Sequence, residues 1–181
     1  GDAVDDDRVR ALEDELRDLA AAEADLERDA EVAERTRIER SALTLADRLR
    51  GAHAPVELAT RGGGRHGGRV GEVGDGWVVL LHVPPGSSSA TAEHLVVVAS
   101  VVAVRGLGRP LVRDEGRLPE RTLGSVLRSW CRDRSHVSVL LTEGEVVAGL
   151  ASAAYADHLE LSTGGGATVA LPYAAIAVVS R

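Results

Sequence analysis

One sequence pattern occurs twice in this chain, and this repetition constrains the fold more than any other feature. Residues 56–80 align without a gap on residues 137–161 at an offset of 81, so that Gly63 coincides with Gly144. Further along, the offset becomes 74, and the difference leaves seven extra residues in the first copy, within 82–94. A match at fixed offset indicates tandem copies of one structural unit. We therefore expect two similar folds joined in one chain.

Each copy has the pattern of a short helix followed by about five strands. In the second copy, apolar residues alternate from Val137 to Leu141, and Pro172 falls at a break between strands, where no donor is needed. Five short strands curl well into a small barrel, because closure removes exposed edges. The prediction is an α+β protein with a long N-terminal helix and two small five-stranded Sm/SH3-like β-barrels, each preceded by a helix. Leu49 and Trp130 are expected to cover the barrel ends.

These patterns divide the chain into four predicted segments. An acidic coiled-coil helix that runs into the helix of the first barrel occupies 1–51, and the first barrel occupies 52–108. A linker follows at 109–121, and a helix with the second barrel occupies 122–181.

The N-terminal segment has the composition of one long helix. It contains no Gly or Pro between Asp2 and Arg50, and it is rich in Ala, Leu, Glu and Arg. Residues 1–34 have a net charge of −10, whereas residues 35–50 have a net charge of +3. Apolar residues recur at three- and four-residue steps, which predicts a dimerisation seam formed by Val9, Leu12, Leu16, Leu19 and Leu26.

The seam is imperfect, so an alternative stays open. Glu23 takes one seam position, Ala30 and Ala33 continue the seam weakly, and the register fails at Arg37 and Arg40. The alternative is a solvated helix that folds back on the rest of the chain. The number and direction of the strands in a coiled coil are also left open.

Composition excludes several kinds of chemistry. The 181 residues include 21 basic residues, all of them Arg, and the absence of Lys excludes a P-loop lysine and a Schiff-base lysine. The single cysteine, Cys131, cannot form an internal disulfide, and we expect a buried, inert thiol. The six His show no metal-ligand spacing, so neither a metal nor a cofactor is expected.

No catalytic motif is present either. Asp75 and Asp157 coincide in the two copies, and we interpret them as turn carboxylates that bond their own backbone. Trp77 and Tyr155 are expected to pack in the core. The sequence thus predicts a protein that is not an enzyme, with no catalytic residue.

The most unusual stretch is a glycine-rich hairpin. Arg61, Arg65, His66 and Arg69 lie there among five glycines, and guanidinium groups on such a backbone suit phosphates. The second copy has two Glu in the corresponding segment, 142–145, and no aromatic residue stands beside the Arg cluster for base stacking. The hairpin is therefore either a contact for RNA or DNA, or a flexible turn with solvated Arg.

A helix followed by a small five-stranded barrel resembles the Sm-like and SH3-like barrels. In the first copy the resemblance rests on Val56, Leu58, Gly68, Val70, Asp75, Trp77 and Val79. The whole chain, acidic helix included, is similar to uncharacterised actinobacterial proteins. The Sm-like resemblance implies RNA binding by rings, but the Asn that often follows the family's Asp-x-apolar step is replaced here by Val78, and by Leu159 in the second copy.

These observations lead to a function and a location. The acidic N-terminus is unlike a signal peptide, and the longest apolar run, 167–180, is shorter than the roughly 20 residues of a membrane helix, so we expect a cytoplasmic protein without membrane contact. The predicted function is that of a non-enzymatic adaptor or regulator that forms a homodimer through its helix and binds a protein partner through its barrels. The alternative is an Sm-like regulator that binds RNA or DNA through the hairpin at 61–69.

Overall fold

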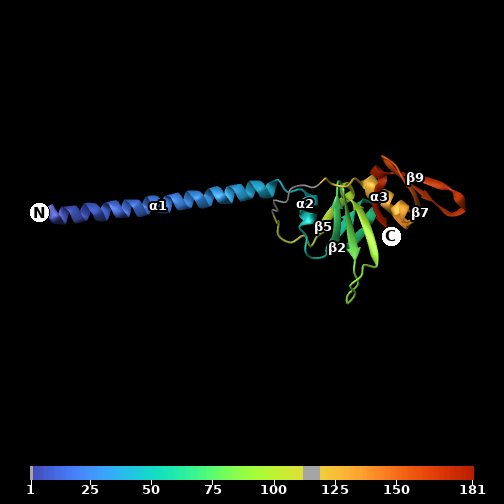
Figure 1. Cartoon of the computed structure of the whole chain (residues 1–181), viewed down its shortest axis with the longest axis horizontal. Coiled ribbons are helices and arrows are strands. Elements are labelled where there is room, and N and C mark those ends of the chain that lie inside the picture. The colour runs from blue at the N-terminus through green and yellow to red at the C-terminus, as the bar shows by residue number, and fades with distance from the viewer. Residues whose placement is uncertain (1, 112–118) are drawn as a thin grey trace. The chain divides into compact units, whose positions relative to one another are not determined.

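The computed structural model of the chain describes residues 2–111 and 119–181 (Figure 1). Its contacts divide the chain into two compact units, Gly1–Leu43 and Thr44–Arg181. The first unit contains α1 (Asp2–Ser41) and the second contains all the strands. We refer to the second as the sheet unit. None of the helices in the described residues is long and apolar enough to cross a membrane.

Helix α1 is long because nothing in its sequence interrupts it. Its 40 residues include no Gly or Pro. Four pairs of opposite charge three or four residues apart add a small stabilisation, of about 0.2–0.5 kcal/mol each: Arg10–Asp6, Arg17–Asp14, Arg28–Asp25 and Arg37–Glu34. The helix ends at Ser41, whereas the sequence pattern predicted continuation into the next helix.

A new helix, α2 (Leu45–Arg50), begins after the break. Thr44 is its N-cap: the Thr44 hydroxyl accepts from the backbone N–H of Asp47, and the Asp47 carboxylate accepts from the backbone N–H of Thr44. This reciprocal pair satisfies two donors at the helix start and fixes where α2 begins.

The remaining elements of the sheet unit fall into two groups. The first group comprises β1 (Val56–Thr60), β2 (Arg65–Gly74), β3 (Trp77–His82), β4 (Ala92–Val97) and β5 (Val101–Arg105). The second group comprises α3 (Leu123–Arg132), β6 (His136–Leu141), β7 (Val146–Ala154), β8 (His158–Ser162), β9 (Thr168–Pro172) and β10 (Ile176–Ser180). Short 3-10 turns at Arg61–Gly63, Val98–Ser100, Gly164–Gly166 and Tyr173–Ala175 connect some of these strands.

All ten strands belong to one antiparallel sheet with the order β5-β1-β2-β3-β4-β10-β6-β7-β8-β9. The predicted α+β class with a long N-terminal helix is confirmed. The sheet is open, however, and is not clearly two separate barrels. The two halves are joined because β4 pairs with β10, with Leu95 opposite Val179. Within the described residues, β5 and β9 each pair with one neighbour only and form the edges.

The two halves of the sheet share one register. Leu58 lies opposite His66 in the first half and Val139 opposite Val147 in the second, so both members of the pair shift by 81. The bulge between β2 and β3 recurs between β7 and β8 at the same offset.

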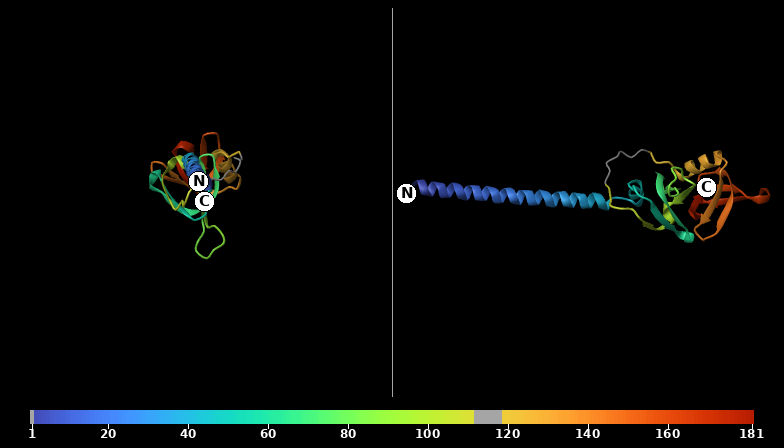
Figure 2. Two further views of the ribbon diagram at one scale, coloured as in Figure 1. Left: turned by 90° about the vertical axis from the view of Figure 1, so that its left-hand side faces the viewer. Right: turned by 90° about the horizontal axis from the view of Figure 1, so that it is seen from below.

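The offset in residue number between the two halves is different for their last strands, β5 and β10. Leu58 pairs with Val104, whereas Val139 pairs with Val179, which gives an offset of 75. The offset of 74 inferred from the sequence was therefore wrong by one, and the first half has six extra residues instead of seven. They belong to the loop between β3 and β4, which projects from the sheet in Figure 1 and in the left view of Figure 2.

The core consists of two clusters that both cross the join. One contains Trp130 and most buried residues of the second half, together with Trp77 and Leu95 from the first half. The other contains Leu49 and Leu58 from the first half, together with buried residues of β10. Burial of apolar surface at the join stabilises the pairing of β4 with β10, because each half covers part of the other's core.

Candidate functional site

The arginines of the hairpin occupy the exposed side of the first half. Residues along β2 alternate between exposed and partly buried, which places Arg65 and Arg69 on the outer face. Arg61 is also exposed, in the turn before β2. Arg105 on β5, which the sequence analysis did not select, lies beside them across Glu57 of β1. We call these four residues the arginine surface.

One carboxylate partly neutralises this surface. The Glu57 carboxylate accepts from Arg65 at 3.1 Å and from Arg105 at 3.3 Å. All three side chains are well exposed, so the ion pairs contribute little to stability. Among the described residues no carboxylate pairs with Arg61 or Arg69. The surface therefore has an excess of positive charge and two guanidinium groups with donors available for a ligand.

The second half shows that the fold does not require these arginines. Their equivalents are Thr142, Val146, Leu150 and Ser180. The same strands adopt the same register in both halves, although one half has four Arg at these places and the other has none. The correspondence between Arg105 and Ser180 follows from the sequence only when the offset of 75 is used.

His66 does not share the arginine surface. Its ring lies on the inner face of β2 and packs against the His94 ring, with centroids 4.9 Å apart. His66 Nε2 is buried without a hydrogen-bond partner, and His94 Nδ1 lies 2.8 Å from the Ser180 hydroxyl. Burial, with a smaller effect of His94, lowers the pKa of His66 below 6.5. Burial, with a smaller effect of His82, lowers the pKa of His94.

A groove of about 800 Å³ opens beside the arginine surface. Arg69, the glycine backbone at 67–68, His82 and Ser87 line it together with other residues of the projecting loop. The loop owes its length to the six residues that the second half lacks. Both differences between the halves, the arginines and the long loop, thus occur next to each other.

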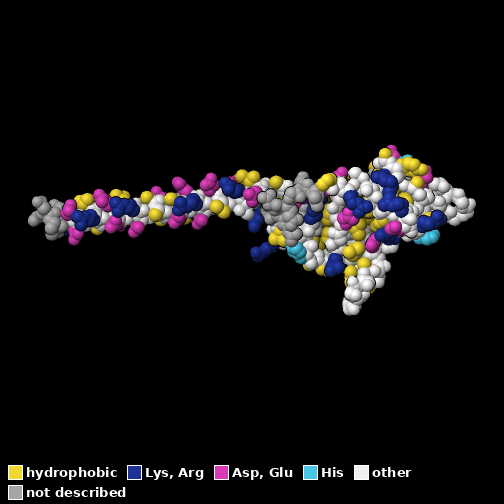
Figure 3. All heavy atoms as spheres, in the orientation of Figure 1, with side chains coloured by type: hydrophobic (Ala, Val, Ile, Leu, Met, Phe, Trp, Pro, Cys, Tyr) yellow, Lys and Arg dark blue, Asp and Glu magenta, His cyan; other side chains and the backbone are white. Residues whose placement is uncertain are grey.

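The predicted seam of α1 is exposed. Val9, Leu12, Leu16, Leu19 and Leu26 are each between 55 % and 69 % exposed. Hydrophobic side chains recur along the visible face of α1 between charged ones (Figure 3).

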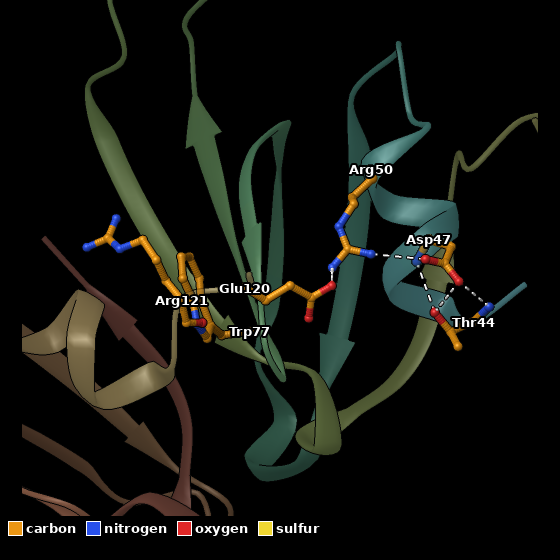
Figure 4. A network of polar contacts seen from close by, with 6 residues as sticks. All are labelled: Thr44, Asp47, Arg50, Trp77, Glu120 and Arg121. Carbon is orange, nitrogen blue, oxygen red and sulfur yellow. Dashed lines mark hydrogen bonds and ion pairs between the residues drawn. The ribbon is translucent and has the colours of Figure 1, made fainter. Parts of the chain in front are cut away.

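The other residues selected from the sequence have structural surroundings. Trp77 is fully buried, and its indole N–H donates to the Arg121 carbonyl at 2.9 Å, in the same region as the Glu120–Arg50–Asp47 contacts (Figure 4). Tyr155, predicted to pack in the core, is 47 % exposed and stacks on His158. Its place in the first half is taken by Gly74, on which the larger Trp77 ring lies.

The turn carboxylate of Asp157 and the single cysteine differ from the surroundings expected for them. The Asp157 carboxylate lies 2.6 Å from His158 Nδ1 instead of bonding its own backbone, and its side chain is almost entirely exposed. Cys131 is partly buried, and burial raises the pKa of its thiol, which disfavours the nucleophilic thiolate. Within residues 2–111 and 119–181, no three potential ligands are grouped in a way that could hold a metal ion.

A comparison with protein-family models, with curated proteins and with solved structures found no match to this chain.

Proposed function

We propose that this protein is a non-enzymatic adaptor that self-associates through α1 and binds a protein partner through its sheet unit. The observation that supports the proposal is the exposed seam of five apolar side chains on α1. A single helix has no core, and burying one Leu or Val side chain is worth about 1.5–3 kcal/mol. A second helix packed on this seam would bury all five.

Point substitutions on α1 test this proposal directly. The doubly substituted variant Leu16→Asp/Leu19→Asp places two charges in the seam, and we expect it to sediment as a monomer while the unchanged chain sediments as a dimer. The control is Val32→Asp, because Val32 is 63 % exposed but lies outside the seam. The control should remain dimeric. A monomeric unchanged chain would contradict the proposal.

The strand order suggests what the sheet unit resembles. In each half, the first strand pairs with both the second and the last, and this order is the same in the two halves. We propose that each half is a curled five-stranded unit of the Sm-like or SH3-like type, that the pair arose by duplication, and that the chain is related to actinobacterial proteins of this architecture. A cytoplasmic protein of this kind would use its outer strand faces and loops for binding.

The arginine surface supports a second candidate function, the binding of single-stranded nucleic acid. Three Arg (Arg65, Arg69 and Arg105) share the outer face of the first half and Arg61 is exposed in the turn before β2, whereas the register-matched second half has no Arg at these places. Arg65 and Arg69 are four residues apart on one strand, which corresponds to roughly 13 Å. Guanidinium groups at that spacing could each contact a phosphate of one extended strand.

Salt dependence tests the second function. Binding of a labelled single-stranded oligonucleotide should weaken as salt rises, with a slope of about 0.7 per phosphate contact. Replacing Arg61, Arg65 and Arg69 by Ala should reduce that slope by about 2. The matched control replaces Arg128, Arg132 and Arg134 of the second half by Ala, which removes the same charge elsewhere. No binding at low salt, or equal slopes for both variants, would reject this function.

A further inference from the structure

We infer that α1 pairs with α1 of a second copy in the antiparallel direction. The inference rests on the proposed self-association of α1 and goes further, because it names how the two helices meet. It is carried by the order of residue types along the seam. From the N-terminus, the heptad positions are occupied by Asp2, Asp5, Val9, Leu12, Leu16, Leu19, Glu23, Leu26, Ala30, Ala33, Arg37 and Arg40.

A parallel pair would bring each seam position next to itself. Glu23 would then face Glu23 of the second copy inside the seam, which places two like charges in contact. Ala30 and Ala33 would face their own copies, and two small side chains would leave unfilled space between the helices. Such a packing defect costs stability. At the C-terminal end, Arg37 and Arg40 would also face identical charges.

An antiparallel pair in which facing residue numbers sum to 42 removes these conflicts. Leu16 then faces Leu26 of the second copy, Leu12 faces Ala30, and Val9 faces Ala33. Each alanine thus meets a larger side chain, and large-against-small layers fill a helix interface evenly. Glu23 faces Leu19 rather than another carboxylate, so no two like charges meet within the seam.

The ends of the helix also become complementary. Residues 2–7 have a net charge of −4, and residues 35–41 have a net charge of +2. In the antiparallel register these two segments lie side by side at both ends of the pair, so the Arg37 and Arg40 positions face acidic positions. The acids that flank the seam repel one another across the pair, but they are exposed, where such repulsion is weak.

This arrangement has a consequence for an adaptor. A two-fold axis near Ala21 closes the pair, so it does not extend into a filament. The two Ser41 residues, after which each chain continues into its sheet unit, are then about 60 Å apart, because 40 residues of helix rise about 1.5 Å each.

Spin-label distances in the full chain test the direction. Cys131→Ser removes the native thiol, and Val32→Cys or Ala21→Cys then introduces one label site outside the seam. Position 21 is level with position 21 of the second copy in both the antiparallel and the parallel pair. Its two labels therefore lie within roughly 20 Å of each other in either arrangement. Position 32 faces position 10, so its labels should lie more than about 30 Å apart in the antiparallel pair but within roughly 20 Å in a parallel pair.

The two label sites separate the possible outcomes. A short distance at 21 with a long distance at 32 supports the antiparallel pair. Short distances at both sites would overturn it and leave self-association intact. A monomeric mass with no measurable coupling at 21 would overturn both self-association and its direction.

Discussion

At the scale of single residues, the join between the halves depends on a glycine. Gly62 has φ of +81° and its position leaves no room for a side chain, since a Cβ would lie 2.3 Å from the Leu141 carbonyl oxygen of β6. Its neighbour Gly63 has the same φ but no atom within 4 Å of a Cβ. A comparison of Gly62 with Gly63 therefore separates the free-energy cost of the backbone conformation from the cost of the contact with the second half.

Substitution of these two glycines should therefore differ in effect. Gly63→Ala should lower the free energy of unfolding by about 1 kcal/mol, the penalty for a left-handed non-glycine residue. Gly62→Ala adds the clash with Leu141 and should cost about 3 kcal/mol or more. Urea unfolding of both variants measures the difference. Equal losses would show that the two halves do not pack at this point.

His66 and His94 should make the stability of the sheet unit depend on pH. Burial holds both pKa values below the ordinary 6.5, so the fold favours the neutral rings. The unfolded chain then binds more protons below pH 6.5, and the free energy of unfolding should fall as the pH is lowered from 6.5 through the folded pKa values. Above pH 6.5 these two residues should contribute no pH dependence.

Unfolding measured between pH 7.5 and pH 5 checks this expectation. In His66→Leu, the loss of stability below pH 6.5 should be smaller than in the unchanged chain. His53→Leu is the control, since His53 is exposed and takes no part in the contact between His66 and His94. An unaltered profile in His66→Leu would contradict the assignment.

The sequence identified the arginines of the hairpin but not the faces on which they lie. Alternation along β2 could have shown that His66 and the arginines point in opposite directions, once the strand was known to start at Arg65. It could not show that His66 meets His94, because that contact depends on how the sheet folds over itself. Arg105 was missed because it is 36 residues from Arg69 and reaches the surface only through the pairing of β5 with β1.

At the scale of elements, local sequence signals were informative where they were strong. The glycine-free, proline-free segment correctly predicted a long helix, and alternating apolar residues located the strands. The end of α1 was misplaced because apolar residues continue into α2 and obscure the break. The signal for the break was present, since Thr44 and Asp47 have the spacing of a capping box.

The two caps of the sheet unit should differ in strength. Thr44 and Asp47 exchange two hydrogen bonds between side chain and backbone, and the Thr44 hydroxyl also donates to the Asp47 carboxylate, whereas Thr122 accepts one from the N–H of Ser125. Thr122→Ala should lower the free energy of unfolding by about 1 kcal/mol, and Thr44→Ala by up to about 2 kcal/mol. Thr44→Ser, which retains the hydroxyl, should stay close to the unchanged chain in thermal unfolding. A smaller loss for Thr44→Ala than for Thr122→Ala would contradict the cap geometry.

At the scale of the whole molecule, the join of the two halves was beyond sequence reasoning. Repetition indicated two units, but the pairing of β4 with β10 depends on apolar residues on the outer side of the first half. Trp77, Val79 and Leu95 all lie in the core cluster of the second half. Their equivalents on β8 and β9 are His158, Glu160 and Ala170. The outer side of the second half thus lacks the large apolar residues that, in the first half, stabilise the join between β4 and β10.

This difference bears on assembly through the sheet edges. Edge strands can pair with other chains, but a polar outer face removes the burial that would stabilise such a pairing. We therefore expect self-association through α1 and none through β5 or β9. Rings of the kind expected from the Sm-like resemblance are not predicted for the sheet unit.

The most direct test is sedimentation equilibrium of the full chain and of a fragment that starts at Thr44, where the second compact unit begins. We expect a dimer for the full chain and a monomer for the fragment at the same concentration. Equal association states, whether both are monomers or both are dimers, would contradict it.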